Sequence, residues 1–406
     1  MQAMRATWTV WDGEAAGDRK QWVDLWSDSA ERHPFAHPDV CAALRPEGGR
    51  LKAVSLSHSG GHVLYPFFLR EIDGDLSRAA GLTGDDGAPL YDLVSPYGYG
   101  GPMRWRIGDV AAATVKFEAD FAVWAEQNRV VSEFARLSLF EESLLPFAGH
   151  TRKRQTNLVR DLQVTSEELS QAVAPKVRSN VRRAQREGVT IVVDTDGRYV
   201  DDFVRIYSET MERRDSADWY RFERPFFECL HTALPGQFAY VYAQLDGRLV
   251  SSDLLLFGRE VGYYFLGGTE AAAFGARPND LVKMESMKWL KERGCKKYVL
   301  GGGITAEDSL ERYKRGFAPT GQVDYFTRER IFSAARYDRL LAAHRRRLSA
   351  VGWEFDETGD YFPAYRREAE LASQARETDD TGVSSESETP NAHADGFSRS
   401  LQEAAS

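Results

Sequence analysis

A glycine-rich connection between a strand and a helix holds the residues best suited to chemistry. Tyr298–Leu300 is a short apolar run typical of a buried strand, three glycines follow it, and a helical pattern then continues to Gly316. Glycine lets a backbone approach a ligand closely, and a helix that begins after such a corner offers N–H groups to an anion or a polarised carbonyl. Lys314 and Arg315 lie at the end of this helix and can reach back over the corner. The pattern predicts either a ligand-binding corner or an ordinary connection with a solvated basic helix end.

A basic stretch from Arg152 to Glu187 is the second notable feature, because nine basic residues there outnumber four acidic ones. Arg178, Arg182 and Arg186 recur every four residues and form one stripe on the helix that we expect at 175–187. Such a stripe either follows the phosphates of a nucleic acid, with an affinity that falls steeply with salt, or is a solvated helix face.

Two further groups of residues could contact a ligand. The segment 95–102 has the aromatic content of an ordered, ligand-facing loop and contains Tyr97 and Tyr99. Glu133 and Arg136 are polar positions in an otherwise apolar strand pattern. They predict either the solvent-facing side of that strand or a paired charge at a cleft.

Composition bounds the class of protein. The chain has 406 residues, of which 42% are hydrophobic, and this length predicts two or three domains. Cys41, Cys229 and Cys295 are too few and too far apart for a disulfide framework, and no histidine spacing is typical of a metal site. The start has no apolar signal region, and no apolar run reaches the roughly 18 residues of a membrane span. We therefore expect a cytoplasmic protein without a metal or a membrane span.

The end of the chain differs from the rest in charge and composition. The net charge is −9, and the segment 371–406, with seven acidic residues and two arginines, contributes −5 of it. This polar segment cannot bury enough apolar surface to order itself, so we expect a disordered acidic tail.

The predicted elements follow the same order in the two halves of the chain: helices, a β-meander, a long helix and a strand. Glycine-containing turns at 59–61 and 246–247 predict hairpins, so each half has a mixed α/β sheet rather than a doubly wound nucleotide fold. The pattern predicts a long loop at 73–102, a connecting segment at 141–154, and a basic helical stretch at 328–348 that packs back on the second half.

This order and four local strings resemble the FemABX group, in which two GNAT-like acyltransferase domains are fused. The similarity covers roughly residues 30–327. The strings are Ser95–Pro102, Ser132–Arg136, Lys176–Ala184, and Gly301–Gly303 followed by Tyr313–Phe317.

The resemblance implies transfer of an aminoacyl group from aminoacyl-tRNA to an amine, which forms a peptide bond. It places Lys314 near the reacting ester as the catalytic residue, with the N–H groups of Gly302 and Gly303 as further donors to the oxyanion. Asp253, Tyr263 and Tyr264 either orient the amine or have packing roles, and Phe317 either shapes the acyl pocket or packs. The expected substrate-binding residues are Tyr97, Tyr99, Glu133, Arg136, Asn180, Asp253, Tyr263, Tyr264 and Phe317. The expected tRNA-binding residues are Arg152, Lys153, Arg154, Lys176, Arg178, Arg182, Arg183 and Arg186.

Relatives that use acyl-CoA bind its pyrophosphate on an R/Q-x-x-G-x-G/A loop before their long helix, where backbone N–H groups contact the phosphates. In this chain the segment 269–279 has one glycine, Gly275, and Pro278 removes one N–H. The absence of that signature argues against conventional CoA binding. The second half also shows no long inserted helical hairpin of the kind that some Fem proteins carry, which leaves the contact with tRNA open.

The sequence thus predicts an α+β chain with an N-terminal GNAT-like domain at 1–150, a C-terminal GNAT-like domain with the site at 151–350, an extension at 351–370 and the tail. We expect a monomeric aminoacyltransferase that needs no cofactor. It takes aminoacyl-tRNA as co-substrate and acts on an amine of a peptide, a cell-wall precursor or a natural-product intermediate. The expected partner is a peptide or a nucleotide-linked small-molecule acceptor. An acyl-CoA-dependent N-acyltransferase and a non-catalytic peptide- or RNA-binding protein are the alternatives.

Overall fold

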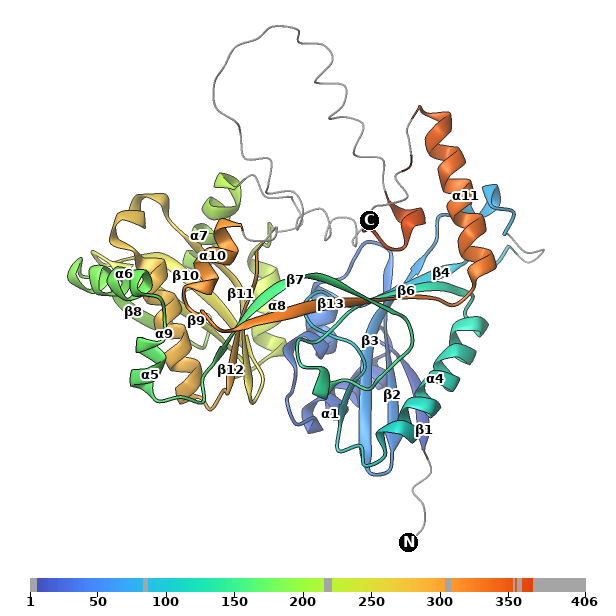
Figure 1. Ribbon diagram of the computed structural model, residues 1–406, viewed down its shortest axis with the longest axis horizontal. Coiled ribbons are helices and arrows are strands. Elements are labelled where there is room, and N and C mark those ends of the chain that lie inside the picture. Colours follow the sequence, from blue (N-terminus) through green and yellow to red (C-terminus); the bar gives the residue numbers. More distant parts are fainter. Residues whose placement is uncertain are drawn as a thin grey trace, which may run out of the picture.

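A computed structural model describes residues 6–82, 87–214, 221–303, 308–352, 355 and 360–367. The predicted acidic tail at 371–406 lies outside these residues. The described chain forms a mixed sheet of thirteen strands that continues through both halves, with helices on its faces (Figure 1). The order of the strands is β1-β2-β3-β4-β6-β13-β7-β12-β11-β10-β9-β8, and β5 pairs with β3.

The first half contains six strands and the helices that cover them. The strands are β1 Thr7–Asp12, β2 Gly49–His58, β3 Gly61–Glu71, β4 Tyr91–Val94, β5 Met103–Trp105 and β6 Val130–Arg136. The helices are α1 Ala16–Asp28, η1 Pro34–Ala36, α2 Pro38–Ala43, α3 Gly74–Ala79, α4 Val110–Gln127 and η2 Glu141–Ser143.

The second half begins at β7. Its strands are β7 His150–Asp161, β8 Thr190–Asp194, β9 Phe238–Leu245, β10 Arg248–Phe257, β11 Val261–Thr269, β12 Lys297–Gly302 and β13 Gln322–Ile331. Its helices are α5 Ser166–Gln171, α6 Pro175–Arg186, α7 Val200–Arg213, α8 Arg224–Ala233, η4 Ala271–Ala276, α9 Pro278–Glu292, α10 Ser309–Arg315, α11 Ala334–Ala350 and η5 Ala364–Arg366.

Two segments that the sequence analysis assigned to loops contain strands. The predicted loop at 73–102 holds α3 and β4, and β4 pairs with β3 on one side and β6 on the other. The predicted connection at 141–154 contains the start of β7, whose first half is polar and largely exposed. A strand without an apolar run gives no periodic signal, so its place in the sheet is decided by its partners.

β13 joins the two halves into one sheet. It pairs antiparallel with β6 along residues 327–331 and with β7 along residues 322–329, and Figure 1 shows β7 and β13 side by side between the halves. The halves therefore share backbone hydrogen bonds as well as side-chain contacts.

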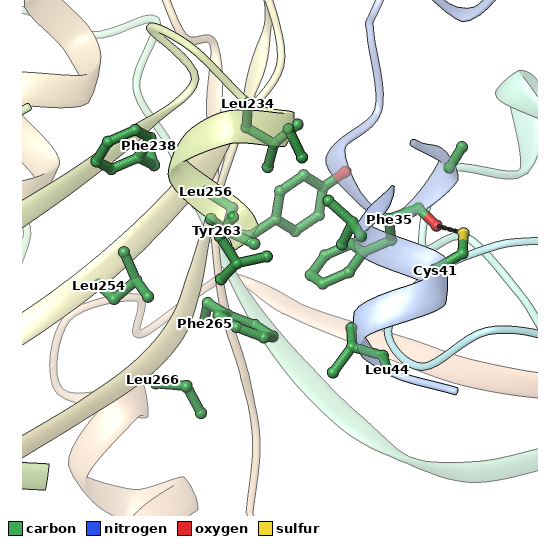
Figure 2. Packing of buried hydrophobic residues seen from close by; sticks show 14 of the residues in the cluster. Phe35, Cys41, Leu44, Leu234, Phe238, Leu254, Leu256, Tyr263, Phe265 and Leu266 are labelled. Atoms are coloured by element: carbon green, nitrogen blue, oxygen red, sulfur yellow. Dashed lines mark hydrogen bonds between the residues drawn. The ribbon is translucent and has the colours of Figure 1, made fainter. Parts of the chain in front are cut away.

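A hydrophobic cluster extends across the junction between the halves. Figure 2 shows Phe35 and Leu44 of the first half packed beside Tyr263, Phe265 and Leu256 of the second. The ring centroids of Phe35 and Tyr263 are 5.4 Å apart. Residues of α7 and α8 belong to the same cluster, whereas α5, α6 and α9 cover the other face of the second half.

The basic helical stretch at 328–348 behaves differently from the prediction. Its first residues belong to β13, and the helix α11 packs against the first half rather than the second. Leu340 and Ala343 of α11 are buried in a cluster with Leu76 of α3 and Val131 of β6, and Figure 1 shows α11 beyond β6. The apolar stripe of a helix does not tell which sheet covers it, so only the fold decides this contact.

Candidate active site

The strands that carry the candidate site separate toward their ends. β11 and β12 are parallel and pair only as far as Tyr263 and Val299, although β11 continues to Thr269 and β12 to Gly302. β12 also has a bulge opposite β7 just before Gly301, whose φ is +78°. A bulge redirects neighbouring groups and is common next to active sites. Polar groups are therefore expected to converge at the end of β12.

Lys314 of α10 reaches this place. The residue is 7% exposed, and its Nζ donates a hydrogen bond to the carbonyl oxygen of Gly302 at 2.6 Å. Burial, followed by the positive charge of Lys283, lowers the pKa of Lys314 to about 7. Near neutral pH the group is therefore present both as an ammonium, which can stabilise an oxyanion, and as an amine, which can accept a proton.

A buried ion pair lies beside Lys314. Nζ of Lys283 on α9 is 2.7 Å from Oδ2 of Asp253 on β10, and both side chains are buried. The same Nζ is 3.4 Å from the centroid of the Tyr264 ring, and Nζ of Lys314 is 5.5 Å from that centroid. The amino groups of two lysines thus lie against one aromatic ring.

The first half contributes Tyr99 to the same region. Its hydroxyl donates a hydrogen bond to Oδ1 of Asn157 on β7 at 2.8 Å. Its ring stacks on Tyr263 with centroids 5.5 Å apart and contacts Tyr325 of β13 edge-on. The site therefore lies at the junction of the two halves and contains residues from both.

Tyr97 and Arg136 line the first-half side of this junction. Nη1 of Arg136 donates to the carbonyl oxygen of Ser95 at 3.1 Å, which fixes the aromatic loop against β6. Burial raises the pKa of Tyr97 to about 12, and the charge of Arg136 opposes this rise. The Tyr97 ring also contacts Phe265 of β11, with centroids 6.4 Å apart.

Glu133 does not belong to this group. Its Oε1 accepts a hydrogen bond from the hydroxyl of Tyr65 at 2.6 Å, and Tyr65 packs against Phe117 and Phe121 of α4. Residues 133 and 136 are an odd number of positions apart on one strand and therefore point to opposite faces of the sheet. The structure separates the pair that the sequence analysis combined.

Asn180 also has a partner away from Lys314. Its Nδ2 donates to Oδ1 of Asp280 at 3.2 Å, and Asp280 lies in the first turn of α9, which Pro278 begins. In addition, the hydroxyl of Tyr313 donates to the carbonyl oxygen of Asn279 at 3.2 Å. A buried carboxyl group therefore occupies the helix N-terminus at which a pyrophosphate would bind in a CoA-dependent relative.

The predicted basic residues fall into two groups. Arg152 and Arg154 of β7 form ion pairs with Glu329 of β13, and Arg152 also pairs with Asp360. Lys153 pairs with Asp324 at 2.7 Å. These three side chains therefore have acidic partners that are distant in sequence, and their predicted contact with tRNA stays a prediction.

The remaining basic residues lie on α6. Lys176, Arg182, Arg183 and Arg186 are exposed, whereas Arg178 is half-buried and donates to the carbonyl oxygens of Gln171 and Val173. Arg183 has an acidic neighbour, Glu187, at 3.7 Å. The exposed positive charge of this stretch is therefore concentrated on α6.

The described residues on either side of the glycine corner show how Lys314 is held. α10 begins at Ser309, and Asp308 accepts a hydrogen bond from the N–H of Glu311 at 2.6 Å. The carbonyl oxygen of Gly302 accepts the hydrogen bond from Lys314, and the role of the Gly302 and Gly303 N–H groups as oxyanion donors stays a prediction. Phe317 is fully buried in the core of the second half and packs on Tyr313, so it has a packing role here.

Asn157, Lys283 and Gly301 were missed as members of the site. Asn157 is in a segment whose sequence has no recognisable pattern, and Lys283 is one of several lysines on an amphipathic helix. Gly301 was named only as part of the glycine corner. For Lys283 one signal was available, because this lysine lies at a position where the helix pattern places apolar residues.

Part of the chain matches a known domain family, and most of it resembles solved structures in fold. The profile of the acetyltransferase (GNAT) domain family matches residues 173–315. A crystal structure of FemX superposes with a TM-score of 0.56 at 13% identity, over 81% of this chain and 97% of that one. The C-terminal domain of a putative lysylphosphatidylglycerol synthetase from Agrobacterium fabrum gives 0.50 at 15% identity, over 80% and 95% of the two chains. The fold is thus GNAT-related and resembles that of FemX over most of this chain.

A sequence relative is more specific. The UDP-N-acetylmuramoylpentapeptide-lysine N(6)-alanyltransferase of Weissella viridescens is 24% identical over 156 residues, which are 37% of this chain and 44% of that protein. The match spans less than half the length of this relative. The chain is thus similar in sequence to an alanyltransferase over this part, and similar in fold to FemX over most of its length. Among the described residues, no helix combines the length and the apolar character needed to cross a membrane.

Proposed function

We propose that the protein transfers an aminoacyl group from aminoacyl-tRNA to the amine of a peptide, a cell-wall precursor or a natural-product intermediate, and so forms an amide bond. The observation that carries this proposal is the position of Lys314. Its Nζ is buried at the junction of the halves and held by the carbonyl oxygen of Gly302, where a donor ester and an acceptor amine can meet.

The chemistry requires little more than positioning and charge stabilisation. An aminoacyl ester is already activated, so a neutral amine can attack its carbonyl carbon once the two are held together. The carbonyl oxygen becomes negative during the attack, and the ammonium form of Lys314 is placed to stabilise it. The C–O bond to the ribose then breaks, and the proton lost by the amine ends on the ribose oxygen.

The choice of donor is supported by two features of the second half. Pro278 and the buried Asp280 occupy the start of α9, and a carboxylate there repels a pyrophosphate. The exposed residues of α6, namely Lys176, Arg182, Arg183 and Arg186, offer positive charge to an RNA backbone instead. Because charged tRNA is a cytoplasmic molecule, we place the reaction in the cytoplasm.

The acceptor is proposed to enter from the first-half side of the junction. Tyr97 and Arg136 lie there beside the aromatic residues of β11, and an arginine side chain can bind a phosphate or a carboxylate of a nucleotide-linked peptide. The relative from Weissella viridescens is named for an acceptor of this kind, the lysine of a UDP-linked pentapeptide. The same acceptor is the first one to test.

Acyl-CoA-dependent N-acyl transfer is the second candidate function. It is favoured by the match of residues 173–315 to the acetyltransferase family. The same lysine could stabilise the oxyanion that forms from a thioester, so Lys314 does not separate the two donors. An assay with each donor is needed to distinguish aminoacyl-tRNA from acyl-CoA.

The purified protein is incubated with tRNA that carries a radiolabelled amino acid and with UDP-N-acetylmuramoyl-pentapeptide. We expect a labelled amide product. This product should not form when the charged tRNA is first digested with ribonuclease, or when Lys314→Met replaces the wild type. It should form with the exposed control Lys20→Met. Acetyl transfer from acetyl-CoA that is insensitive to ribonuclease would select the second candidate. Binding of tRNA or peptide without turnover of either donor would refute both enzymatic proposals.

A further inference from the structure

Asn157 has an unused hydrogen-bond donor in the site. The residue lies on β7 and is 1% exposed. Its Oδ1 accepts the hydrogen bond from Tyr99, whereas its Nδ2 has no hydrogen-bond partner among the residues that the structure describes. A buried polar group without a partner costs about 1–3 kcal/mol. A bound ligand can supply the missing partner.

Asn157, Tyr99 and Lys314 converge on one point of the backbone. A Cβ placed on Gly301 would lie 3.2 Å from Nζ of Lys314, 3.8 Å from Oδ1 of Asn157 and 3.9 Å from the hydroxyl oxygen of Tyr99. Glycine at this position, with its φ of +78°, lets the three side chains approach each other. Residues from β7, α10 and the loop of the first half thus meet at the bulge of β12.

We propose that the amide N–H of Asn157 is a second donor, beside Lys314, to the carbonyl oxygen of the acyl donor. This inference rests on the proposed acyl transfer. As the amine attacks, the new C–N bond forms and the carbonyl oxygen takes up the electron pair, and the two donors stabilise that negative charge. The charge returns to the carbonyl as the ester C–O bond breaks, so both donors contribute only while the charge exists.

Tyr99 has a positioning role in this arrangement. Its hydroxyl holds Oδ1 of Asn157 at 2.8 Å, which fixes the plane of the amide and therefore the direction of the free N–H. Its ring is held in turn by stacking on Tyr263. The first half thus contributes to catalysis through the second half, and the site is incomplete without the loop that carries Tyr99.

The test uses four variants of the full chain. Asn157→Asp replaces the donor by an acceptor of the same shape, and Asn157→Leu removes both polar atoms. Tyr99→Phe keeps the ring and removes only the hydroxyl. Asn128→Asp makes the same chemical change at the end of α4, where the side chain donates to the carbonyl oxygen of Trp124, and is the control. For each we measure kcat and KM with charged tRNA, and the pKa of Lys314 from the shift of its ¹³Cε resonance.

We expect Asn157→Asp and Asn157→Leu to lower kcat by about 10²–10³-fold with little change in KM, as for the loss of one oxyanion donor. Tyr99→Phe should lower kcat by a smaller factor, and Asn128→Asp should leave it unchanged. The carboxylate of Asn157→Asp should also raise the pKa of Lys314, because an opposite charge nearby favours the ammonium. That change is visible without any substrate.

The outcomes separate this inference from the proposed function. Wild-type turnover that Asn157→Asp and Asn157→Leu retain in full would overturn the inference and leave the function standing. An unchanged pKa of Lys314 in Asn157→Asp would overturn it as well, because the two groups would then not share a site. Turnover with acetyl-CoA alone would refute the tRNA-dependent function, and the same comparison of kcat would then be made with the thioester. Without turnover of either donor, both proposals fail.

Discussion

Lys314→Met should abolish transfer and yet stabilise the fold. Burial lowers the pKa of Lys314 from its ordinary value of 10.5 to about 7, so the folded protein holds a charge that the unfolded chain accommodates more easily. Below pH 7 both states are protonated and the full cost of burying the charge is present. Between pH 7 and 10.5 the unfolded chain binds more protons, and stability therefore rises with pH until the cost has disappeared.

The magnitude follows from the shift. The fall of the pKa from 10.5 to about 7 corresponds to roughly 5 kcal/mol of unfolding free energy, of which about 4 kcal/mol applies at pH 7 and about 1 kcal/mol at pH 9.5. The lost hydrogen bond to Gly302 offsets about 1 kcal/mol. We expect Lys314→Met to be about 3 kcal/mol more stable than the wild type at pH 7, an advantage that vanishes near pH 9.5.

Urea unfolding followed by tryptophan fluorescence at both pH values measures this difference. Lys20→Met is the matched control, because Lys20 is exposed and pairs with Asp24 of its own helix. An equal or lower stability of Lys314→Met at pH 7, or a difference that does not change with pH, would show that Lys314 is not a buried cation. The catalytic assignment of Lys314 would then lose its electrostatic basis.

Three further predictions concern other parts of the molecule. Arg182→Glu combined with Arg186→Glu should weaken tRNA binding and reduce the slope of log affinity against log salt by about 0.7–0.9 for each lost phosphate contact. Filter binding at several salt concentrations measures this slope. An unchanged slope would exclude α6 as the RNA surface. Glu133→Gln should leave turnover unchanged. Burial raises the pKa of Glu133 to about 7, so the folded state binds more protons between about pH 4.5 and 7 and wild-type stability falls as the pH rises through that range. The glutamine variant should lack this decline in urea titrations, and a loss of activity would return Glu133 to the site. Gly301→Ala places a Cβ 3.2 Å from Nζ of Lys314 at positive φ. We therefore expect this variant to lose about 1–2 kcal/mol of stability and to have a lower kcat. Full activity in this variant would contradict the convergence of side chains at the bulge.

Local patterns in the sequence determined much of this protein. Glycine turns predicted the hairpins, apolar periodicity predicted α4 and α9 closely, and the glycine corner followed by Lys314 lies within one short stretch. These features depend on neighbours in sequence, such as the backbone freedom of glycine and the period of a helix face. For the same reason the resemblance to fused GNAT-like domains could be recognised before the structure was considered.

The tertiary structure decided which side chains meet. Asn157 and Tyr99 are 58 residues apart, and Lys283 finds Asp253 only because α9 packs against β10. The pairing of β7 with β13 gave an acidic partner to Arg152 and Arg154, and strand alternation turned Glu133 away from Arg136. Periodicity can show that a residue is buried, but the partner of a buried polar group is set by strand register and by the contact between the halves. The sequence therefore located Lys314, whereas the fold supplied the surroundings that lower its pKa and the second donor beside it.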